Sequence, residues 1–513
     1  MKEKNKYGQY FTIQSIARFM VDLIHHNHDA RILEPSCGKG VFLDALSNAG
    51  FTNIDAYEID RNIGNPYPYV KYESFISASL NQYDVVIGNP PYIRWKNLEK
   101  ELKEELAKSP LWTKYFNSLC DYLFIFILKS ICQLAEGGEL IFICTEYWMN
   151  TTNSRSLRDF MASNGYISDI YHFKEAPLFE GVCASFIIFR YVKGDHKEES
   201  INLYRYKGSS QPSYEDLKRG SCFTHEIIPQ FEKGSRWLLA TQSQQELLSS
   251  FEASCSVKAS DLFAEPVINR IGTYCDIGNG MVSGLDKAFN MTNEDGFNER
   301  ERQCMIKVLK AKDLDHFVFH SESKYFFIQD SISRDTFSDS FPVVMNHMKP
   351  YLEDLEQRYN YGKDIPYWEF VFPRNYALFS RQEKRIMVPC KERISNKNHF
   401  RFVLAGPEYY PLQDVTCILR KSNCRESIEY LLAYLNNDRV FEWLAFNGIV
   451  KGYIVEFSEA PIASIPYRPI NWDEEREVQI HDAITGAVNR FIATRDETYL
   501  NIINQNFNYL FHG

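Results

Sequence analysis

The chain has 513 residues, 44% hydrophobic and 24% charged, which is typical of a soluble globular protein with two or three domains. Its net charge of −10 argues against binding to nucleic acid through overall charge, so contact with DNA would require a local basic surface. The 12 cysteines form no C-x-x-C pair, which argues against a zinc site and a disulfide scaffold.

No segment is expected to enter a membrane. The N-terminal residues are charged and lack an apolar core, so they do not resemble a secretory signal. The longest apolar stretch, residues 119–134, is interrupted by Asp121, Lys129 and Gln133. We therefore predict a cytoplasmic protein.

The first elements are a polar-aromatic loop and an amphipathic helix. Residues 7–12 read Tyr-Gly-Gln-Tyr-Phe-Thr and form the loop. The helix that follows has apolar residues at the spacing of a core-facing stripe, namely Ile16, Phe19, Met20, Leu23 and Ile24.

Residues 31–43 predict the first strand–turn–helix unit of a doubly wound sheet. The strand ends at Glu34, the turn Pro-Ser-Cys-Gly-Lys-Gly follows, and a helix begins near Val41. A second acidic residue, Glu58, ends the next strand and is suited to hold a ribose diol. In such folds, ligands bind at the carboxyl ends of the strands.

Two cofactors suit this arrangement, a nicotinamide dinucleotide and S-adenosylmethionine. A dinucleotide-binding turn needs G-x-G-x-x-G, but here Gly38 and Gly40 are followed by Phe42 and Leu43 without a third glycine. The acidic Glu34 before the turn suits a cofactor with a cationic amino end. S-adenosylmethionine therefore fits better, and Phe75 is placed to contact its adenine.

Residues 84–92 predict a buried strand that delivers Asn89-Pro-Pro-Tyr92 at its carboxyl end. The two prolines fix their own φ angles and keep Asn89 out of the α region, so the loop leaves the sheet extended and stiff. Such a loop can hold a substrate group without moving.

The chemistry that fits this loop is methyl transfer to an exocyclic amine. The lone pair of adenine N6 is delocalised into the ring, which makes it a poor nucleophile. If the Asn89 side-chain oxygen and the Pro90 carbonyl accept both N6 hydrogens, the nitrogen is drawn toward tetrahedral geometry. Positioning and preorganised dipoles then supply the catalysis, and Tyr92 offers an aromatic face to the base.

The remainder of the first half continues the α/β pattern. We predict a helix over residues 119–135 that ends at Gly137 and Gly138. Strands are predicted over residues 140–144, 167–171 and 184–191, with a loop at the rim of the site before the last of them.

The second half changes character. Residues 193–244 are polar and predict a connection with a few edge elements, so we divide the chain into domains 1–235 and 236–513. The second domain is expected to be a mixed α+β domain, with a helical stretch at 427–446 and a helical tail from Trp472.

A local basic segment in the second domain is a candidate for phosphate contact. Residues 381–401 hold seven basic and two acidic residues. A solvated charged face is the alternative, and Lys287 and Trp368 are either near DNA or in the core. The candidate DNA-binding residues are Lys287, Arg381, Lys384, Arg385, Lys391 and Arg393.

In its order of motifs, the chain resembles the γ class of adenine-N6 DNA methyltransferases of type II restriction-modification systems, which carry a TaqI-like specificity domain. The resemblance implies an S-adenosylmethionine-dependent methyltransferase sheet followed by a DNA-recognition domain. It implies that the 7–12 loop folds over the methionine end of the cofactor. The implied cofactor-binding residues are Phe11, Thr12, Glu34, Pro35, Ser36, Gly38, Gly40, Glu58, Ile59 and Phe75.

The resemblance also implies a target site. Asn89, Pro90 and Tyr92 would act on an adenine flipped out of the duplex, with Phe179 on the face opposite Tyr92. Tyr171 and Phe173 compete with Phe179 for that role. The family usually has an aspartate where this chain has Ser74, which leaves a weaker acceptor for the adenine amine of the cofactor.

We therefore predict a methyltransferase that modifies adenine N6 at a short specific site in double-stranded DNA. It is expected to act as a monomer without a metal, with a possible separate cognate endonuclease. Two alternatives are a protein-glutamine N5 methyltransferase and a non-catalytic DNA-binding specificity module. The Pro389-Cys390 pair, which resembles the nucleophile of cytosine-C5 enzymes, lies outside the α/β half and is expected to be packed.

The substitution Asn89→Ala removes the acceptor oxygen, so we expect it to abolish methyl transfer while cofactor and DNA binding stay largely intact. A transfer assay with separate binding measurements checks this expectation. Methylation by Asn89→Ala at a rate near that of the wild type would refute the assigned mechanism.

Overall fold

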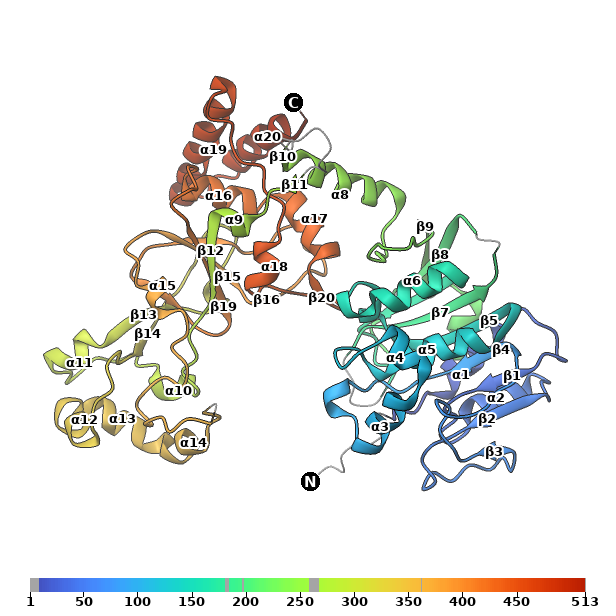
Figure 1. The fold of residues 1–513 in the computed structure, drawn as a ribbon. Coiled ribbons are helices and arrows are strands. Elements are labelled where there is room, and N and C mark those ends of the chain that lie inside the picture. The colour runs from blue at the N-terminus through green and yellow to red at the C-terminus, as the bar shows by residue number, and fades with distance from the viewer. Residues whose placement is uncertain (1–8, 180–183, 196–197, 258–266, 361, 513) are drawn as a thin grey trace. The chain divides into compact units, whose positions relative to one another are not determined.

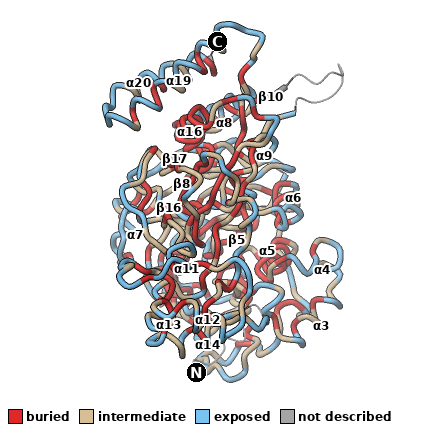
Figure 2. The backbone as a smooth tube through the Cα atoms, turned by 90° about the vertical axis from the view of Figure 1, so that its left-hand side faces the viewer, coloured by how far each residue is buried: buried red, intermediate tan, exposed pale blue. Residues whose placement is uncertain are grey.

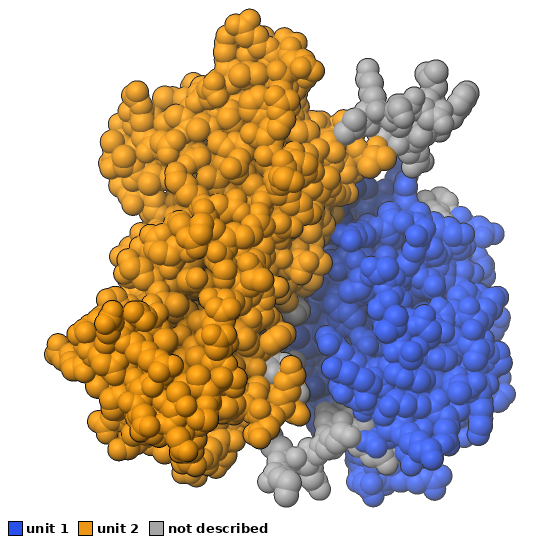
Figure 3. Space-filling view, turned by 60° about the vertical axis from the view of Figure 1, so that its left-hand side comes forward, with its two compact units in different colours: residues 1–245 blue, residues 246–513 orange. Residues whose placement is uncertain are grey.

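The computed structural model describes residues 9–179, 184–195, 198–257, 267–360 and 362–512. The chain forms two compact units, Met1–Gln245 and Glu246–Gly513, which Figure 3 shows in blue and orange. The boundary falls inside helix α8 (Gln242–Ser254), after the predicted division at 235. Residues 7, 8 and 180–183 of the two predicted loops lie outside the described residues.

Unit 1 is built on one mixed nine-stranded sheet, in the order β3-β2-β1-β4-β5-β7-β6-β8-β9 (Figure 1). The first five strands in this order are parallel, while β7 runs antiparallel to β5 and β6. The strands are β1 (Ile32–Glu34), β2 (Ile54–Tyr57), β3 (Val70–Lys71), β4 (Tyr83–Gly88), β5 (Leu134–Thr145), β6 (Gly165–Lys174), β7 (Phe186–Lys193), β8 (Ser200–Tyr206) and β9 (Phe223–Pro229). The predicted α/β fold is confirmed.

Helices cover both faces of this sheet because its central strands are apolar on both sides. In β4, Val86 packs in the same core as α5, whereas Val85 and Ile87 belong to the core that includes α1 and α2. Figure 2 shows α5 and β5 as mostly buried. The helices of the unit are α1 (Gln14–Asp22), α2 (Val41–Asn48), α3 (Lys100–Lys108), α4 (Pro110–Tyr115), α5 (Tyr122–Gln133), α6 (Arg155–Asn164) and α7 (Tyr214–Arg219).

The predicted end of α5 is wrong. The helix stops at Gln133 and the chain enters β5 at Leu134, so Gly137 and Gly138 lie inside the strand. The pairing of β4 with β5 shifts register there, and a Cβ at Gly138 would approach Ala135 O to 2.9 Å. The two glycines therefore permit an irregular strand entry instead of ending the helix.

The strand order brings the predicted site residues to one edge of the sheet. Strand β1 lies between β2 and β4, and the connections leave it in opposite directions, which makes the carboxyl end of β1 a topological switch point. Glu34, Glu58 and Asn89 end or follow these three strands.

A buried ion network joins the middle strands. The Arg190 guanidinium lies 2.7 Å from Glu139 Oε1 and 3.0 Å from Asp169 Oδ2, so it connects β7 with β5 and β6. The Arg190 side chain is 11% exposed and that of Glu139 is 4% exposed. Glu139 Oε2 also accepts a hydrogen bond from the His25 amide, just beyond α1.

Unit 2 contains small sheets surrounded by short helices, as expected for an α+β domain. The largest sheet is antiparallel, with order β12-β19-β15-β17, and two three-stranded sheets have orders β14-β13-β18 and β16-β21-β20. Its strands are β10 (Ser256–Val257), β11 (Val267–Ile268), β12 (Cys275–Asn279), β13 (Met305–Leu309), β14 (Ser323–Phe326), β15 (Arg385–Pro389), β16 (Lys391–Arg393), β17 (Val403–Ala405), β18 (Tyr409–Pro411), β19 (Val415–Arg420), β20 (Ile449–Lys451) and β21 (Ile454–Glu456).

The two longest helices of unit 2, α19 and α20, lie at its C-terminal end and form the predicted helical tail. In the described part of the chain, no helix has both the length and the apolar character that a membrane crossing requires. The helices are α9 (Ile271–Tyr274), α10 (Asp286–Phe289), α11 (Glu299–Gln303), α12 (Arg334–Ser340), α13 (Pro342–Met348), α14 (Leu352–Gln357), α15 (Tyr376–Phe379), α16 (Ile428–Leu435), α17 (Asp438–Asn447), α18 (Glu459–Ala463), α19 (Glu475–Thr494) and α20 (Thr498–His512).

The substitution Arg190→Met leaves Glu139 and Asp169 as uncompensated acids in the sheet, so we expect it to lower the free energy of unfolding of unit 1 by about 3–5 kcal/mol. Hydrogen exchange of the β5 and β7 amides measures this loss. The matched control is Arg31→Met, which breaks a solvent-exposed pair with Asp84 and should leave the protection of these amides unchanged. Equal effects of the two substitutions would contradict the importance of burial.

Candidate active site

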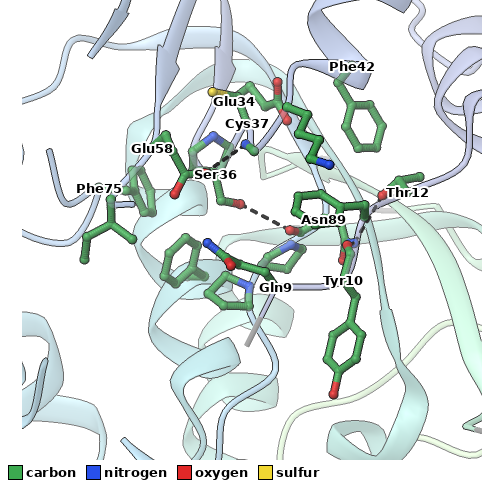
Figure 4. Close-up of a pocket in the computed structure, with 18 of the residues that line it drawn as sticks. Gln9, Tyr10, Thr12, Glu34, Ser36, Cys37, Phe42, Glu58, Phe75 and Asn89 are labelled. Carbon is green, nitrogen blue, oxygen red and sulfur yellow. Dashed lines mark hydrogen bonds between the residues drawn. The ribbon is translucent and has the colours of Figure 1, made fainter. Parts of the chain in front are cut away.

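The carboxyl edge of the unit 1 sheet borders a cavity of about 260 Å³ (Figure 4). Its walls are the loop of residues 9–12, the β1–α2 turn, the residues that follow β2, β3 and β4, and side chains of α3 and α5. All ten predicted cofactor-binding residues except Gly40 line it, and so do Asn89 and Pro90.

The β1–α2 turn depends on two glycines in the left-handed region. Gly38 has φ +52° and Gly40 has φ +91°, backbone angles that residues other than glycine rarely adopt. A Cβ at Gly38 would also lie 3.5 Å from the Phe11 ring, and one at Gly40 would lie 3.1 Å from Asn65 Nδ2. The glycines thus let the loop of residues 9–12 and the Asn65 side chain close against the turn.

Glu58 ties the end of β2 to this turn. Its Oε2 accepts a hydrogen bond of 2.8 Å from Gly38 N, and its Oε1 accepts one of 2.7 Å from Asp60 N. Burial raises the pKa of Glu58, while these main-chain donors act in the opposite direction. Each oxygen keeps lone pairs for a ligand, which suits the hydroxyl groups of a ribose diol.

Glu34 is a buried acid with an unused acceptor. The residue is 1% exposed, and its Oε2 has no hydrogen-bond partner among the described residues. Burial, and secondly the nearby charge of Glu58, raise the pKa of Glu34 well above its usual range. An unpartnered carboxyl oxygen at the wall of a cavity is a site where a cationic ligand would relieve the cost of burial.

The Asn89 side chain is held on both of its polar atoms. Its Nδ2 donates to Tyr10 O at 2.7 Å and to Thr12 Oγ1 at 3.1 Å, while its Oδ1 contacts the Tyr92 hydroxyl. The Asn89 main-chain oxygen accepts from Ser36 Oγ at 3.2 Å (Figure 4). This network orients the amide so that its oxygen faces Tyr92 and its nitrogen faces the loop of residues 9–12.

Asn89 therefore also helps to hold a wall of the cavity, which changes one expectation from the sequence. Loss of its side chain removes the donor to Tyr10 O and Thr12 Oγ1, and hydrogen bonds of this kind contribute about 1 kcal/mol each. We now expect Asn89→Ala to weaken cofactor binding by up to about thirtyfold, the equivalent of about 2 kcal/mol, in addition to abolishing transfer.

Aromatic rings gather beside Asn89. The Tyr10 ring lies 6.0 Å from Tyr92 and 6.3 Å from Phe179, measured between ring centroids. Phe179 is 4% exposed and packs on Phe186 at 4.7 Å.

Tyr171 and Phe173, the alternatives to Phe179 for the face opposite Tyr92, pack against other aromatic residues. Tyr171 stacks on Tyr204 at 4.6 Å, and Phe173 packs against Tyr206 and Phe223. The contact with Tyr10, which itself stacks on Tyr92, therefore favours Phe179 for the predicted role.

The opposite end of the cavity is apolar and includes residues that the sequence did not point to. Phe75 and Ile59, two of the predicted cofactor-binding residues, line it together with Ser74. Leu102, Tyr122 and Phe126 complete this end, with the Phe126 ring 5.1 Å from that of Phe75. These three residues lie on α3 and α5, whose apolar patterns indicate only core helices.

The structure corrects the predicted basic surface of unit 2. Arg385 is fully buried and donates to the main-chain oxygens of Phe379 and Arg381 at 2.7 Å each, so it is a core residue and not a phosphate contact. Trp368 is also a core residue, because it is 5% exposed and stacks on Phe337 at 4.7 Å.

Most other members of the basic segment have acidic partners. Arg381 pairs with Asp276 and Glu383, and Lys384 pairs with Glu429. Lys287, outside the segment, pairs with Asp354. Lys391 and Arg393, on β16, have exposed side chains. The local excess of positive charge is therefore largely neutralised within the unit.

Two family models match unit 1, and together they indicate the class of protein. The model described as Eco57I restriction-modification methylase matches residues 42–179, and the model described as N-6 DNA Methylase matches residues 1–49. These matches contain the glycine turn, the Asn89-Pro-Pro-Tyr92 loop and Phe179.

Close relatives extend the likeness to the whole chain. It is 45% identical over 509 residues to the type II methyltransferase M.HindII of Haemophilus influenzae, and 42% identical to M.HincII of Haemophilus influenzae, with 98% of this chain and 97% of each relative covered. The chain therefore belongs to the adenine-N6 methyltransferase family of type II restriction-modification systems.

A solved structure of the type IIL restriction-modification enzyme MmeI in complex with DNA has a similar fold. The TM-score is 0.59 at 11% sequence identity, and the match covers 97% of this chain and 71% of that chain. At this identity the likeness concerns the fold alone.

The substitution Glu34→Gln should stabilise the cofactor-free protein at pH 7. Because its pKa is raised in the folded state, Glu34 binds a proton more tightly there than in the unfolded chain. The carboxyl therefore opposes folding increasingly as the pH rises above its ordinary pKa of 4.5. Thermal unfolding of both proteins between pH 4 and pH 8 checks this, and a lower midpoint for Glu34→Gln at pH 7 would contradict it.

Proposed function

We propose that this chain transfers a methyl group from S-adenosylmethionine to N6 of an adenine in double-stranded DNA, as a γ-class enzyme with a TaqI-like specificity domain. The observation that carries the proposal is the Asn89 amide, oriented at the cavity wall on a loop stiffened by Pro90 and Pro91. Relatives named as type II methyltransferases over almost the whole length support it.

The cavity suits S-adenosylmethionine. The unpartnered Glu34 oxygen would accept from the ammonium group of the methionine part, and Glu58 would accept from the ribose hydroxyls. Phe75 and Ile59 would contact the adenine. When bound, the cofactor supplies an electrophilic methyl group on a sulfonium centre.

The residues of the loop after β4 prepare the nucleophile. Asn89 Oδ1 and the Pro90 carbonyl would accept the two N6 hydrogens, so that the nitrogen lone pair turns out of the ring plane toward the methyl group. In the transfer, the N6–carbon bond would form as the sulfur–carbon bond breaks, and the surplus N6 proton would pass to water from its hydrogen bond with Asn89 Oδ1 or the Pro90 carbonyl. The Tyr92 hydroxyl uses one lone pair of Asn89 Oδ1, and the second lone pair of this oxygen remains for an N6 hydrogen.

The aromatic residues would hold the flipped base. Tyr92 and Phe179 supply the two faces, and stacking contributes on the order of 1–3 kcal/mol per base, enough to offset much of the cost of unstacking. Because the Tyr10 ring contacts both Tyr92 and Phe179, entry of the base requires Tyr10 to move aside.

Unit 2 would recognise a short specific site in the DNA. The exposed Lys391 and Arg393 on β16 are candidates for phosphate contact, together with Lys287, Arg381 and Lys384. We further propose that the enzyme acts as a monomer and that a cognate endonuclease is a separate chain.

Membership of the family argues against the two alternative functions, a protein-glutamine methyltransferase and a non-catalytic DNA-binding module.

Expression in a methylation-deficient bacterium, followed by single-molecule sequencing of its DNA, tests the proposed function. We expect N6-methyladenine at one recurrent sequence, and none in cells that carry Asn89→Ala. Absence of modified adenine from cells with folded, cofactor-binding protein would contradict the proposal.

A further inference from the structure

Lys129 is a buried lysine in the middle of α5. It is 7% exposed, and the ten residues from Tyr122 to Ile131 are all buried. A lysine in such surroundings costs free energy unless polar groups replace the water that its ammonium loses. Burial lowers the pKa of Lys129 to about 8, which leaves it mainly charged at neutral pH.

Main-chain oxygens of one turn provide that replacement. Lys129 Nζ donates to Ile76 O at 2.7 Å and to Ala78 O at 3.0 Å. The turn is closed from its other side by Ser74, whose Oγ accepts from Ile76 N at 3.2 Å and whose main-chain oxygen accepts from Ala78 N at 3.0 Å. The ammonium thus bonds a turn that is 51–53 residues away in the sequence.

This turn carries two wall residues of the cavity. Ser74 and Phe75 line its apolar end, immediately before the two carbonyls that Lys129 holds. Lys129 Nζ also lies 5.1 Å from the centroid of the Phe75 ring, within the range of a cation–π contact. Since a methionine would fill the same volume without the desolvation cost, packing alone does not explain the lysine.

We propose that Lys129 is a positioning residue, which holds the 74–78 turn so that Phe75 presents its ring to the cofactor adenine. This inference rests on the proposed function, because it assumes that the cavity binds S-adenosylmethionine. Lys129 is buried and does not line the cavity, so its loss should weaken cofactor binding and leave the methyl-transfer step unchanged.

The test compares Lys129→Met, which keeps the volume and removes both donors, with Lys129→Arg, which keeps a cation able to reach the carbonyls. Lys193→Met is the matched control. Lys193 also donates to a main-chain oxygen, that of Leu134, at 2.6 Å, and it does not line the cavity. Calorimetry measures the Kd of S-adenosylmethionine and of its demethylated product. Single-turnover assays at saturating cofactor measure transfer.

For Lys129→Met we expect a Kd raised about tenfold or more for both ligands, with a single-turnover rate and a DNA affinity within about twofold of the wild type. Lys129→Arg should recover most of the affinity, and Lys193→Met should bind as the wild type does. If Lys129→Met does not fold, Lys129→Gln replaces it, because its amide reaches only one carbonyl, and an intermediate loss is expected.

Wild-type affinity in a folded Lys129→Met or Lys129→Gln variant would overturn the inference. A parallel loss of transfer rate and DNA affinity would overturn it as well, because the role would then be general stability. Failure of the wild-type protein itself to bind S-adenosylmethionine would instead contradict the proposed function.

Discussion

The hydrogen bonds of the Asn89 side chain join three parts of unit 1 that are far apart in the sequence. The amide belongs to the end of β4, its nitrogen holds the loop of residues 9–12, and its oxygen meets Tyr92, whose hydroxyl also lies 2.8 Å from Ile143 O on β5. An amide has one donor end and one acceptor end, so fixing the donor end leaves the oxygen with a single orientation. The loop that closes the cofactor cavity therefore also aims the atom proposed to receive the target amine.

Two buried acids in the cavity wall lower the stability of the protein without a ligand. Glu34 and Glu58 both have raised pKa values because the protein displaces their water, and the charge of Glu58 raises the pKa of Glu34 further. A ligand with an ammonium group and hydroxyl groups would supply the missing partners. Burial of these acids destabilises the fold of the ligand-free protein. A ligand that pairs with them removes this penalty and therefore binds more tightly than one that does not. Such a trade between stability and function is common at binding sites.

Much of the site was predictable because its signals are local in the sequence. Gly38 and Gly40 are required by a turn with positive φ, and Pro90 and Pro91 constrain the backbone next to Asn89 wherever they occur. Other features depend on tertiary contacts that no local pattern reports. Leu102, Tyr122 and Phe126 look like ordinary core residues until α3 and α5 are placed beside the cavity. Arg385 looks like a surface cation, yet its guanidinium caps buried carbonyls.

The most direct measurement identifies the atom that receives the methyl group. The purified protein is incubated with S-adenosylmethionine that has a trideuterated methyl group and with DNA that contains the methylated sequence found by single-molecule sequencing. The nucleosides of the DNA and the peptides of the protein are then analysed by mass spectrometry. The account predicts that the label is found on adenine N6 and depends on the Asn89 side chain. Label on cytosine or on a glutamine side chain would contradict it.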